Sequence, residues 1–211
     1  MEMAVTDGQS AAVNPWLAIW RHPRNTIRYL LSTDPDRMIW VLAALGGAQG
    51  YLAQLLSMNQ GPGAWPLPVV VAVACLAGAI GGILSLIIGA KLVRVIGDLL
   101  GGEGAEEHIR TALAWSSVPA VVHLLLMLVL VVAVPWIYQP VDPLRTMSAA
   151  ASVGLLAALA GMLVLTAWQF VIAVAGVAEA HHYSVLRAAL TLFGPLLLLF
   201  ALGGVLRLML G

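Results

Sequence analysis

The feature that most constrains this chain is a stretch without any charged residue, which runs from Met38 to Ala90. Roughly 20 helical residues cross a hydrocarbon core of about 30 Å, so this stretch is long enough for two crossings. The segment Met58–Pro68 (MNQGPGAWPLP) divides it, because glycine and proline end helices and mark turns. Two membrane-spanning helices are therefore predicted, at about 38–57 and 67–95.

Three more uncharged stretches follow, at Thr111–Val141, Thr146–Ala178 and Ala188–Leu206. They predict spans at about 118–137, 149–178 and 188–208. The apolar runs lack the strict alternation of a membrane β-barrel, and a helix pairs every backbone amide within its own segment. The expected fold is all-α: a polytopic bundle of five transmembrane helices that forms one domain over 34–211.

The composition excludes the common soluble classes. The chain is 61% hydrophobic and 9% charged, with a mean hydropathy of +0.97, whereas about a quarter of the residues in a soluble domain are charged. Ten basic and ten acidic residues give no net field to attract phosphate, so nucleic acid is not an expected partner. The preference for arginine over lysine favours a GC-rich genome and hence a bacterial source.

The basic residues beside the spans predict the orientation, because loops on the cytoplasmic side of a membrane are enriched in Lys and Arg. With five spans and a cytoplasmic N-terminus, only Arg145 and Arg207 lie on the outer side. Eight basic residues then lie on the inner side: Arg21, Arg24, Arg28, Arg37, Lys91, Arg94, Arg110 and Arg187. The expected location is the bacterial inner membrane, with the C-terminus outside.

The N-terminal segment is expected to lie along the membrane surface. Residues 1–13 lack the features of a signal peptide and are expected to be a flexible N-terminus. Residues 14–33 combine apolar and basic faces, which predicts interfacial amphipathic helices in contact with membrane lipids. The expected anchors are Trp16, Trp20, Arg21, Arg24 and Arg28. Docking of a partner or sensing of lipids is the alternative use of this segment.

Small residues at intervals of three or four predict how the spans pack, because helices in lipid associate where their backbones approach closely. Such residues occur in spans one, two and four, which predicts a tight bundle of these three. The rows are Gly46 and Gly50; Ala74, Gly78 and Gly82; Gly81, Ser85 and Gly89; and Gly154, Ala158 and Gly161. Contact with a second copy or with other membrane proteins is the competing use.

The ionisable residues form no recognisable reaction centre. His123 lies one turn past Pro119 in span three, where a carbonyl freed by the proline could accept its proton; a proton relay is the alternative. Two clusters, Glu106–His108 and Glu179–His182, lack the ligand spacing of a zinc site. No metal, cofactor or enzymatic activity is therefore expected.

Three segments resemble one known family. They are NPWLAIWRHPRNTIRYLLSTDP at 14–35, GGEGAEEHIRTALAWSSVP at 101–119 and EAHHYSVLRAAL at 179–190. Together they resemble bacterial members of the Ypt-interacting-protein (YIP) domain family, which are membrane proteins with five spans and a cytoplasmic N-terminus. The eukaryotic relatives act in vesicle traffic and contact small GTPases of the Rab class. Their long N-terminal region and their Asp-Leu-Tyr-Gly-Pro motif are missing here, which puts GTPase binding in doubt.

The best candidate site lies where spans three and four reach the cytoplasm. A polar vestibule is expected there, and the alternative is that the same residues only cap the two helix ends. Its expected residues are Trp115, Ser116, Ser117, Pro119, His123, Glu179, His181, Tyr183 and Ser184. The resemblance implies a non-enzymatic scaffold, organiser or trafficking-like adaptor. A small channel or transporter is the alternative. Against it, the span centres are nearly all Ala, Leu, Val and Gly, and Gln169 in the inner half of span four is the main exception.

Overall fold

The computed structural model describes residues 14–58, 65–133 and 148–210, and in these ranges all regular structure is helical. The helices are α1 (Pro15–Ala18), α2 (Pro23–Thr33), α3 (Ile39–Met58), α4 (Leu67–Leu99), α5 (Glu106–Trp115), α6 (Val118–Ala133), α8 (Ala149–Ala180) and α9 (Val185–Leu210). The expected flexible segment 1–13, residues 134–137 of span three and Arg145 lie outside the described residues.

Four stretches among the described residues are long and apolar enough to cross a membrane. They are α3, α4, the pair α5–α6 (Glu106–Ala133) and α8. The bundle is helical throughout its described part, as predicted. The fifth predicted span, 188–208, lies on α9 and is not one of these four.

Local sequence explains where several helices begin. The Asn14 side chain accepts a hydrogen bond from the Trp16 amide (3.1 Å), and Pro15 occupies the first turn of α1. The Ser148 hydroxyl accepts from the Ala151 amide (3.3 Å) at the start of α8. Pro119 is the second residue of α6, so the helix begins there, which agrees with the expected start or kink.

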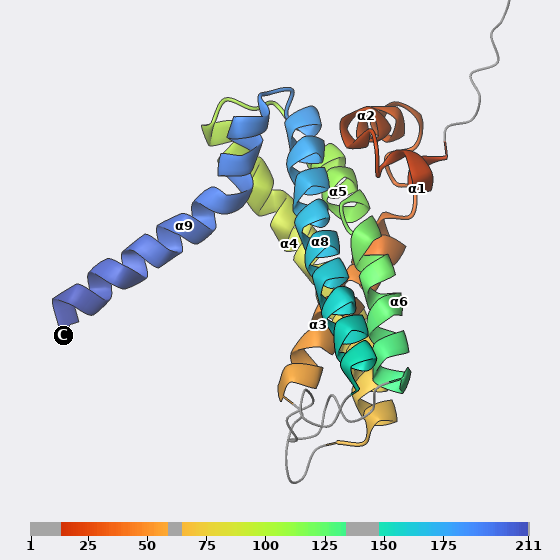
Figure 1. The fold of residues 1–211 in the computed structure, drawn as a ribbon. Helices are drawn as coiled ribbons and strands as arrows, with labels where there is room; N and C mark the ends of the chain where they lie inside the picture. Colours follow the sequence, from red (N-terminus) through yellow and green to blue (C-terminus); the bar gives the residue numbers. More distant parts are fainter. Residues whose placement is uncertain (1–13, 59–64, 134–147, 211) are drawn as a thin grey trace, which may run out of the picture.

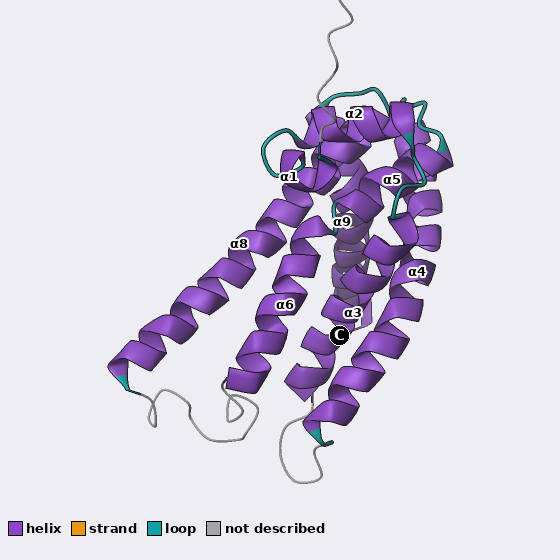
Figure 2. Cartoon of the chain, turned by 90° about the vertical axis from the view of Figure 1, so that its right-hand side faces the viewer, coloured by secondary structure: helices purple, strands orange, loops and turns teal. Residues whose placement is uncertain are grey.

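The long helices lie side by side, and α1 and α2 lie across one end of them (Figures 1 and 2). We call this end the cap and define it as α1, α2, the 100–105 connection and the 181–184 connection. In Figure 1, α9 begins beside the cap end of α8 and then extends away from the bundle as an arm. The last residues of α3 and α6 and the first residues of α4 and α8 lie at the end opposite the cap (Figure 2).

The closest helix pair is α3 with α4, and glycine makes the contact possible. A Cβ on Gly78 would lie 2.7 Å from the Ala48 Cα and 2.8 Å from the Gly47 carbonyl. A Cβ on Gly82 would collide with the Ala43 carbonyl. The row of Gly78 and Gly82 is therefore used as predicted, and it meets Gly47.

The predicted grouping of spans one, two and four is wrong for span four. Helix α8 packs mainly against α2, α5 and α6. A Cβ on Gly154 or Gly161 would meet nothing within 4 Å, while Gly176 lies against Ala112 of α5. Gly46 also lies against Ser117 rather than another glycine. The α5–α6 pair thus occupies the place beside α3 that the small-residue pattern had given to span four.

Candidate functional site

The cap is closed by a carboxylate from α8 and two arginines from α2. The Arg24 Nε donates to Glu179 Oε2 (2.7 Å), while Arg28 donates from Nε to Oε1 (2.6 Å) and from Nη2 to Oε2 (3.0 Å). Glu179 is buried, with 6% of its side chain exposed, whereas the side chains of Arg24 and Arg28 are 44% and 63% exposed. We call these three residues the clamp.

Electrostatics explains why Glu179 needs two cations. It lies in the last turn of α8, where the negative end of the helix dipole disfavours a carboxylate. Arg24 and Arg28 are four residues apart and therefore lie on one face of α2. The hydrogen bond and the charge of Glu179 raise the pKa of the Arg28 guanidinium. Two residues expected to meet lipid headgroups thus bind the buried carboxylate of Glu179.

Aromatic contacts join α1 to α5 beneath the clamp. The rings of Trp16 and Trp115 meet edge to face, with their centroids 5.7 Å apart and their planes at 64°. Trp115 is fully buried, and its Nε1 donates to the Arg37 carbonyl (3.1 Å). The Thr111 hydroxyl donates to the Pro35 carbonyl (2.6 Å), so α5 also holds the chain that enters α3.

His181 fills the space between the two connections of the cap. Its Nδ1 accepts a hydrogen bond from the Gly104 amide (3.1 Å), and its ring stacks on Tyr183 with centroids 5.0 Å apart. The Tyr183 hydroxyl bonds the Thr191 hydroxyl on α9 (2.6 Å). Burial lowers the pKa of His181, and the nearby charge of Asp98 opposes that effect. Burial also raises the pKa of Tyr183.

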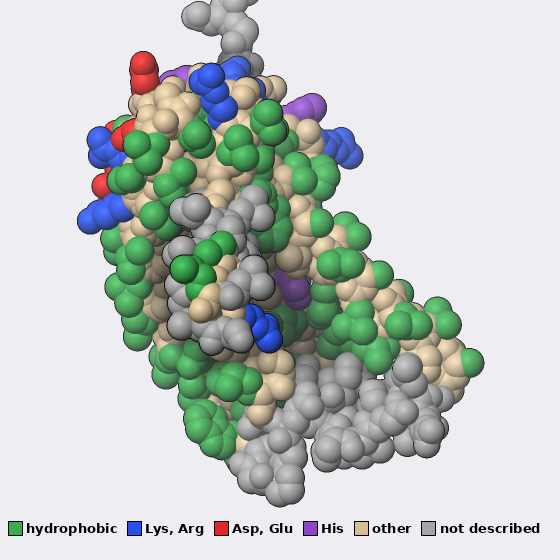
Figure 3. All heavy atoms as spheres, turned by 90° about the vertical axis from the view of Figure 1, so that its left-hand side faces the viewer, with side chains coloured by type: hydrophobic (Ala, Val, Ile, Leu, Met, Phe, Trp, Pro, Cys, Tyr) green, Lys and Arg blue, Asp and Glu red, His purple; other side chains and the backbone are tan. Residues whose placement is uncertain are grey.

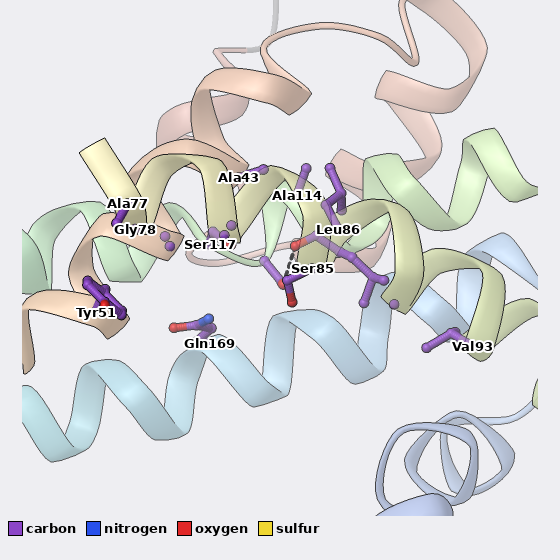
Figure 4. Close-up of a pocket in the computed structure, with 17 residues that line it drawn as sticks. Ala43, Tyr51, Ala77, Gly78, Ser85, Leu86, Val93, Ala114, Ser117 and Gln169 are labelled. Carbon is purple, nitrogen blue, oxygen red and sulfur yellow. Dashed lines mark hydrogen bonds between the residues drawn. The ribbon is translucent and has the colours of Figure 1, made fainter. Parts of the chain in front are cut away.

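A groove of about 540 Å³ lies between α3, α4, the turn joining α5 to α6, and α8. Figure 4 shows Gln169 of α8 pointing into it, with Tyr51, Ser85 and Ser117 around it. The remaining lining residues are mostly Gly, Ala, Val and Leu, and no charged side chain is among them. The groove thus offers hydrogen-bonding groups without charge.

The predicted vestibule residues do not gather at one place: some lie in the cap, some line the groove, and Trp115, Pro119, His123 and Glu179 lie on α5, α6 and α8. Ser116 and Ser117 line the groove, and the Ser116 hydroxyl donates to the Leu113 carbonyl (2.6 Å). The buried members of the set are Trp115, Ser116, Pro119, Glu179, His181 and Tyr183. Half-buried His123 lies on α6, and exposed Ser184 accepts from the Arg187 amide (3.4 Å) at the start of α9.

The predicted lipid anchors are divided in the same way. Trp16 and Trp20 are half-buried against the core, Arg24 and Arg28 belong to the clamp, and Arg21 is exposed. In the space-filling view of Figure 3, most of the visible charged side chains gather at the end of the bundle where the cap lies, and hydrophobic side chains cover the helices below.

Sequence reasoning missed the pairing of α2 with Glu179 and the contacts of His181 with Gly97, Gly102 and Gly104. A signal for the first was present, because Glu179 is the first charged residue after the uncharged stretch Thr146–Ala178. Among the described residues, no three His, Cys, Asp or Glu side chains gather as metal ligands.

Comparison with known proteins identifies the family. A search of curated proteins and a search of solved structures each find no match. The model of the Yip1 domain matches residues 17–206, which includes the clamp, His181 and the groove. Proteins with this domain are generally non-enzymatic membrane proteins. Since the match covers nearly the whole sequence, the chain belongs to the Yip1 domain family.

Proposed function

We propose that this Yip1-domain protein is a non-enzymatic scaffold or organiser that presents its cap to other proteins at the cytoplasmic membrane surface. The clamp carries the proposal: Glu179 takes up Arg24 and Arg28, which would otherwise bind lipid headgroups. The cap therefore has a fixed shape held by the bundle. A fixed surface of this kind suits recognition of a partner better than a helix that floats among lipids.

The proposed topology has five spans, a cytoplasmic N-terminus and an outer C-terminus in a bacterial inner membrane. Helix α9 has 26 residues, which at about 1.5 Å per residue is long enough to cross the hydrocarbon core. The excess of arginine on the cap side supports this orientation. Fusion of alkaline phosphatase after Gly211 should give an active enzyme, and fusion after Ala105 an inactive one. The reverse pattern would refute the topology.

Photo-crosslinking in cells tests the scaffold role directly. A photoreactive residue at exposed Arg21, in the turn between α1 and α2 of the cap, should give discrete crosslinked protein bands, and one at Leu76, which is exposed on α4, should give lipid adducts. The bands at position 21 should weaken when Arg24 and Arg28 are both replaced by Ala, because the cap then loses its fixed position. Lipid adducts alone at both sites would contradict the proposal.

The groove supports a small channel or transporter as a second candidate. Broken helices at membrane depth are typical of transporter sites, and the break between α5 and α6 brings Ser116 and Ser117 to the groove opposite Gln169. The absence of charge in the lining favours a neutral solute.

Filling the groove separates the two candidates. A Cβ at Gly81 or at Gly50 would meet nothing within 4 Å, but only Gly81 lines the groove. If the protein is a transporter, Gly81→Leu should abolish solute flux in proteoliposomes, whereas the matched control Gly50→Leu should not. If it is a scaffold, wild-type liposomes should show no flux of ions or neutral solutes, and neither variant should change the crosslinks at position 21.

A further inference from the structure

The helices α4 and α8 end in the same way and meet at those ends. At the end of α4, Gly101 has φ +80° and the Gly102 amide donates to the Gly97 carbonyl (2.9 Å). At the end of α8, His182 has φ +57° and the Tyr183 amide donates to the Ala178 carbonyl (3.1 Å). Both are Schellman ends, in which a left-handed residue closes the last turn. Two connections of the cap thus start from similar tight turns.

His181 joins these two ends through a cradle of three glycines. A Cβ on Gly97 or Gly102 would collide with its imidazole ring, and one on Gly104 would lie 2.8 Å from Nδ1. Only 2% of His181 is exposed. The glycines therefore leave a space that the ring fills, and the Gly104 amide donates to Nδ1 across it (3.1 Å).

The hydrogen bond fixes the protonation state of the ring. Because Nδ1 accepts from Gly104, the ring is neutral and its proton is on Nε2. Nε2 is buried and meets no partner at strict hydrogen-bond geometry, although a looser hydrogen bond with the Val93 backbone favours the charged ring. A second proton would go to Nδ1, where it would face the N–H of Gly104. Two donors cannot bond each other, so the protonated ring cannot keep its place.

We propose that His181 is a proton-operated latch that ties the α4–α5 connection to the end of α8 and opens when the ring is protonated. In the open state Gly104 loses its acceptor and the stacking on Tyr183 ends. The 100–105 connection then separates from the 181–184 connection. The latch holds whether or not the cap binds a partner, so it can be tested apart from the proposed function.

The surrounding charges are consistent with a latch that is closed at neutral pH. Asp98 on α4 favours the charged ring, but Arg94 lies 3.8 Å from its carboxylate. His182 and burial both disfavour the charged ring, and burial has the largest effect. The remaining titratable and charged groups near the two connections are Glu103, Glu179, which the clamp neutralises, Tyr183 and Arg187.

Hydrogen exchange of the Gly104 amide reads the latch directly. The measurement uses the full chain in lipid nanodiscs at pH 7.5 and 5.5, with protection corrected for the intrinsic exchange rate. If His181 has an ordinary histidine pKa of 6.5 in the open state and binds no second proton in the closed state, the opening equilibrium constant rises by up to about tenfold between pH 7.5 and 5.5. The protection of the Gly104 amide should fall by the same factor. Amides near Leu52, in the core between α3 and α6, should keep their protection and so report that the bundle stays folded.

Two variants and a matched control make the test specific. His181→Asn keeps an acceptor for Gly104 but cannot be protonated, so protection should not depend on pH. His182→Asn, at an exposed left-handed position that Asn tolerates, should respond like the wild type. Gly104→Ala fills the cradle and should lower the protection of the 100–105 connection already at pH 7.5.

Three results would overturn the latch. The first is equal protection of Gly104 at both pH values in the wild type. The second is a tenfold loss that persists in His181→Asn, and the third is one that disappears in His182→Asn. If His181→Asn does not fold, the wild type and Gly104→Ala decide: normal protection of Gly104→Ala at pH 7.5 would contradict the proposal.

Discussion

The members of the clamp differ in burial, and this difference predicts how much unfolding free energy is lost when either the carboxylate or the arginines are replaced. The Glu179 carboxylate is buried, whereas the side chains of Arg24 and Arg28 are 44% and 63% exposed. Replacing Arg24 and Arg28 by Ala leaves a buried carboxylate without a cation. Replacing Glu179 by Gln leaves two guanidinium groups that water can solvate. The first change should therefore destabilise the protein more than the second.

The magnitudes follow from the burial of Glu179. A buried charge that loses its partners costs about 3–5 kcal/mol, and this is the expected loss of unfolding free energy when both arginines are removed. Glu179→Gln removes charge-assisted hydrogen bonds without leaving a buried charge. Since its partners are largely exposed and screened, about 1–2 kcal/mol is expected. Removing all three charged groups together should bring the loss back toward that of Glu179→Gln.

Reversible unfolding by sodium dodecyl sulfate in mixed micelles measures these differences. Tryptophan fluorescence includes the signal of the Trp16–Trp115 pair, and circular dichroism reports on the helices. Arg21→Ala is the matched control, because Arg21 is exposed and lies outside the clamp; its effect should stay within about 0.5 kcal/mol. The reasoning fails if Glu179→Gln costs more than the double arginine variant, or if the triple variant is as unstable as the double one.

Three further outcomes are expected. Gly82→Ala should destabilise the bundle by about 1–3 kcal/mol, because its Cβ would collide with backbone on α3, whereas Gly81→Ala should be neutral or stabilising in the same unfolding assay. Trp115→Phe should cost about 1–3 kcal/mol by leaving the Arg37 carbonyl without its donor; an unchanged unfolding midpoint would exclude that bond as a stabilising contact. Burial lowers the pKa of His181 in the folded chain below the ordinary value of 6.5, so as the pH falls the unfolded chain binds the proton before the folded chain does. Stability should thus fall from pH 7.5 to 5.5, and a flat profile would contradict this.

Local signals predicted the helices well, because in a membrane the length of an apolar run and its prolines decide where a helix lies. Helix α4 starts at Leu67 because Pro66 and Pro68 flank that position, and α6 starts at Val118 because Pro119 follows it. The helices of the first two predicted spans begin or end within a few residues of the expected positions. These features depend only on neighbouring residues.

The packing could not be derived in the same way. Gly46 and Gly47 are adjacent, and only the three-dimensional structure shows that Gly47 meets α4 while Gly46 meets Ser117. The basic face of α2 fits a lipid surface as well as it fits a carboxylate, so its sequence could not reveal Glu179. Small residues and amphipathic faces indicate that a helix surface makes contacts. Which surface it contacts depends on residues far away in the sequence.

The distance along the chain between the members of the clamp has a consequence for biosynthesis. Arg24 and Glu179 are 155 residues apart, and a ribosome that adds about 5–20 residues per second takes roughly 8–30 s to cover that interval. During this time the first helices to emerge lack the Glu179 carboxylate, and we expect their basic face to rest on anionic headgroups instead. Arg24 and Arg28 can bind Glu179 only once α8 is complete. Closure of the clamp therefore marks a chain whose four long helices have been made, and a chain truncated before Glu179 is expected to keep these arginines on the lipid.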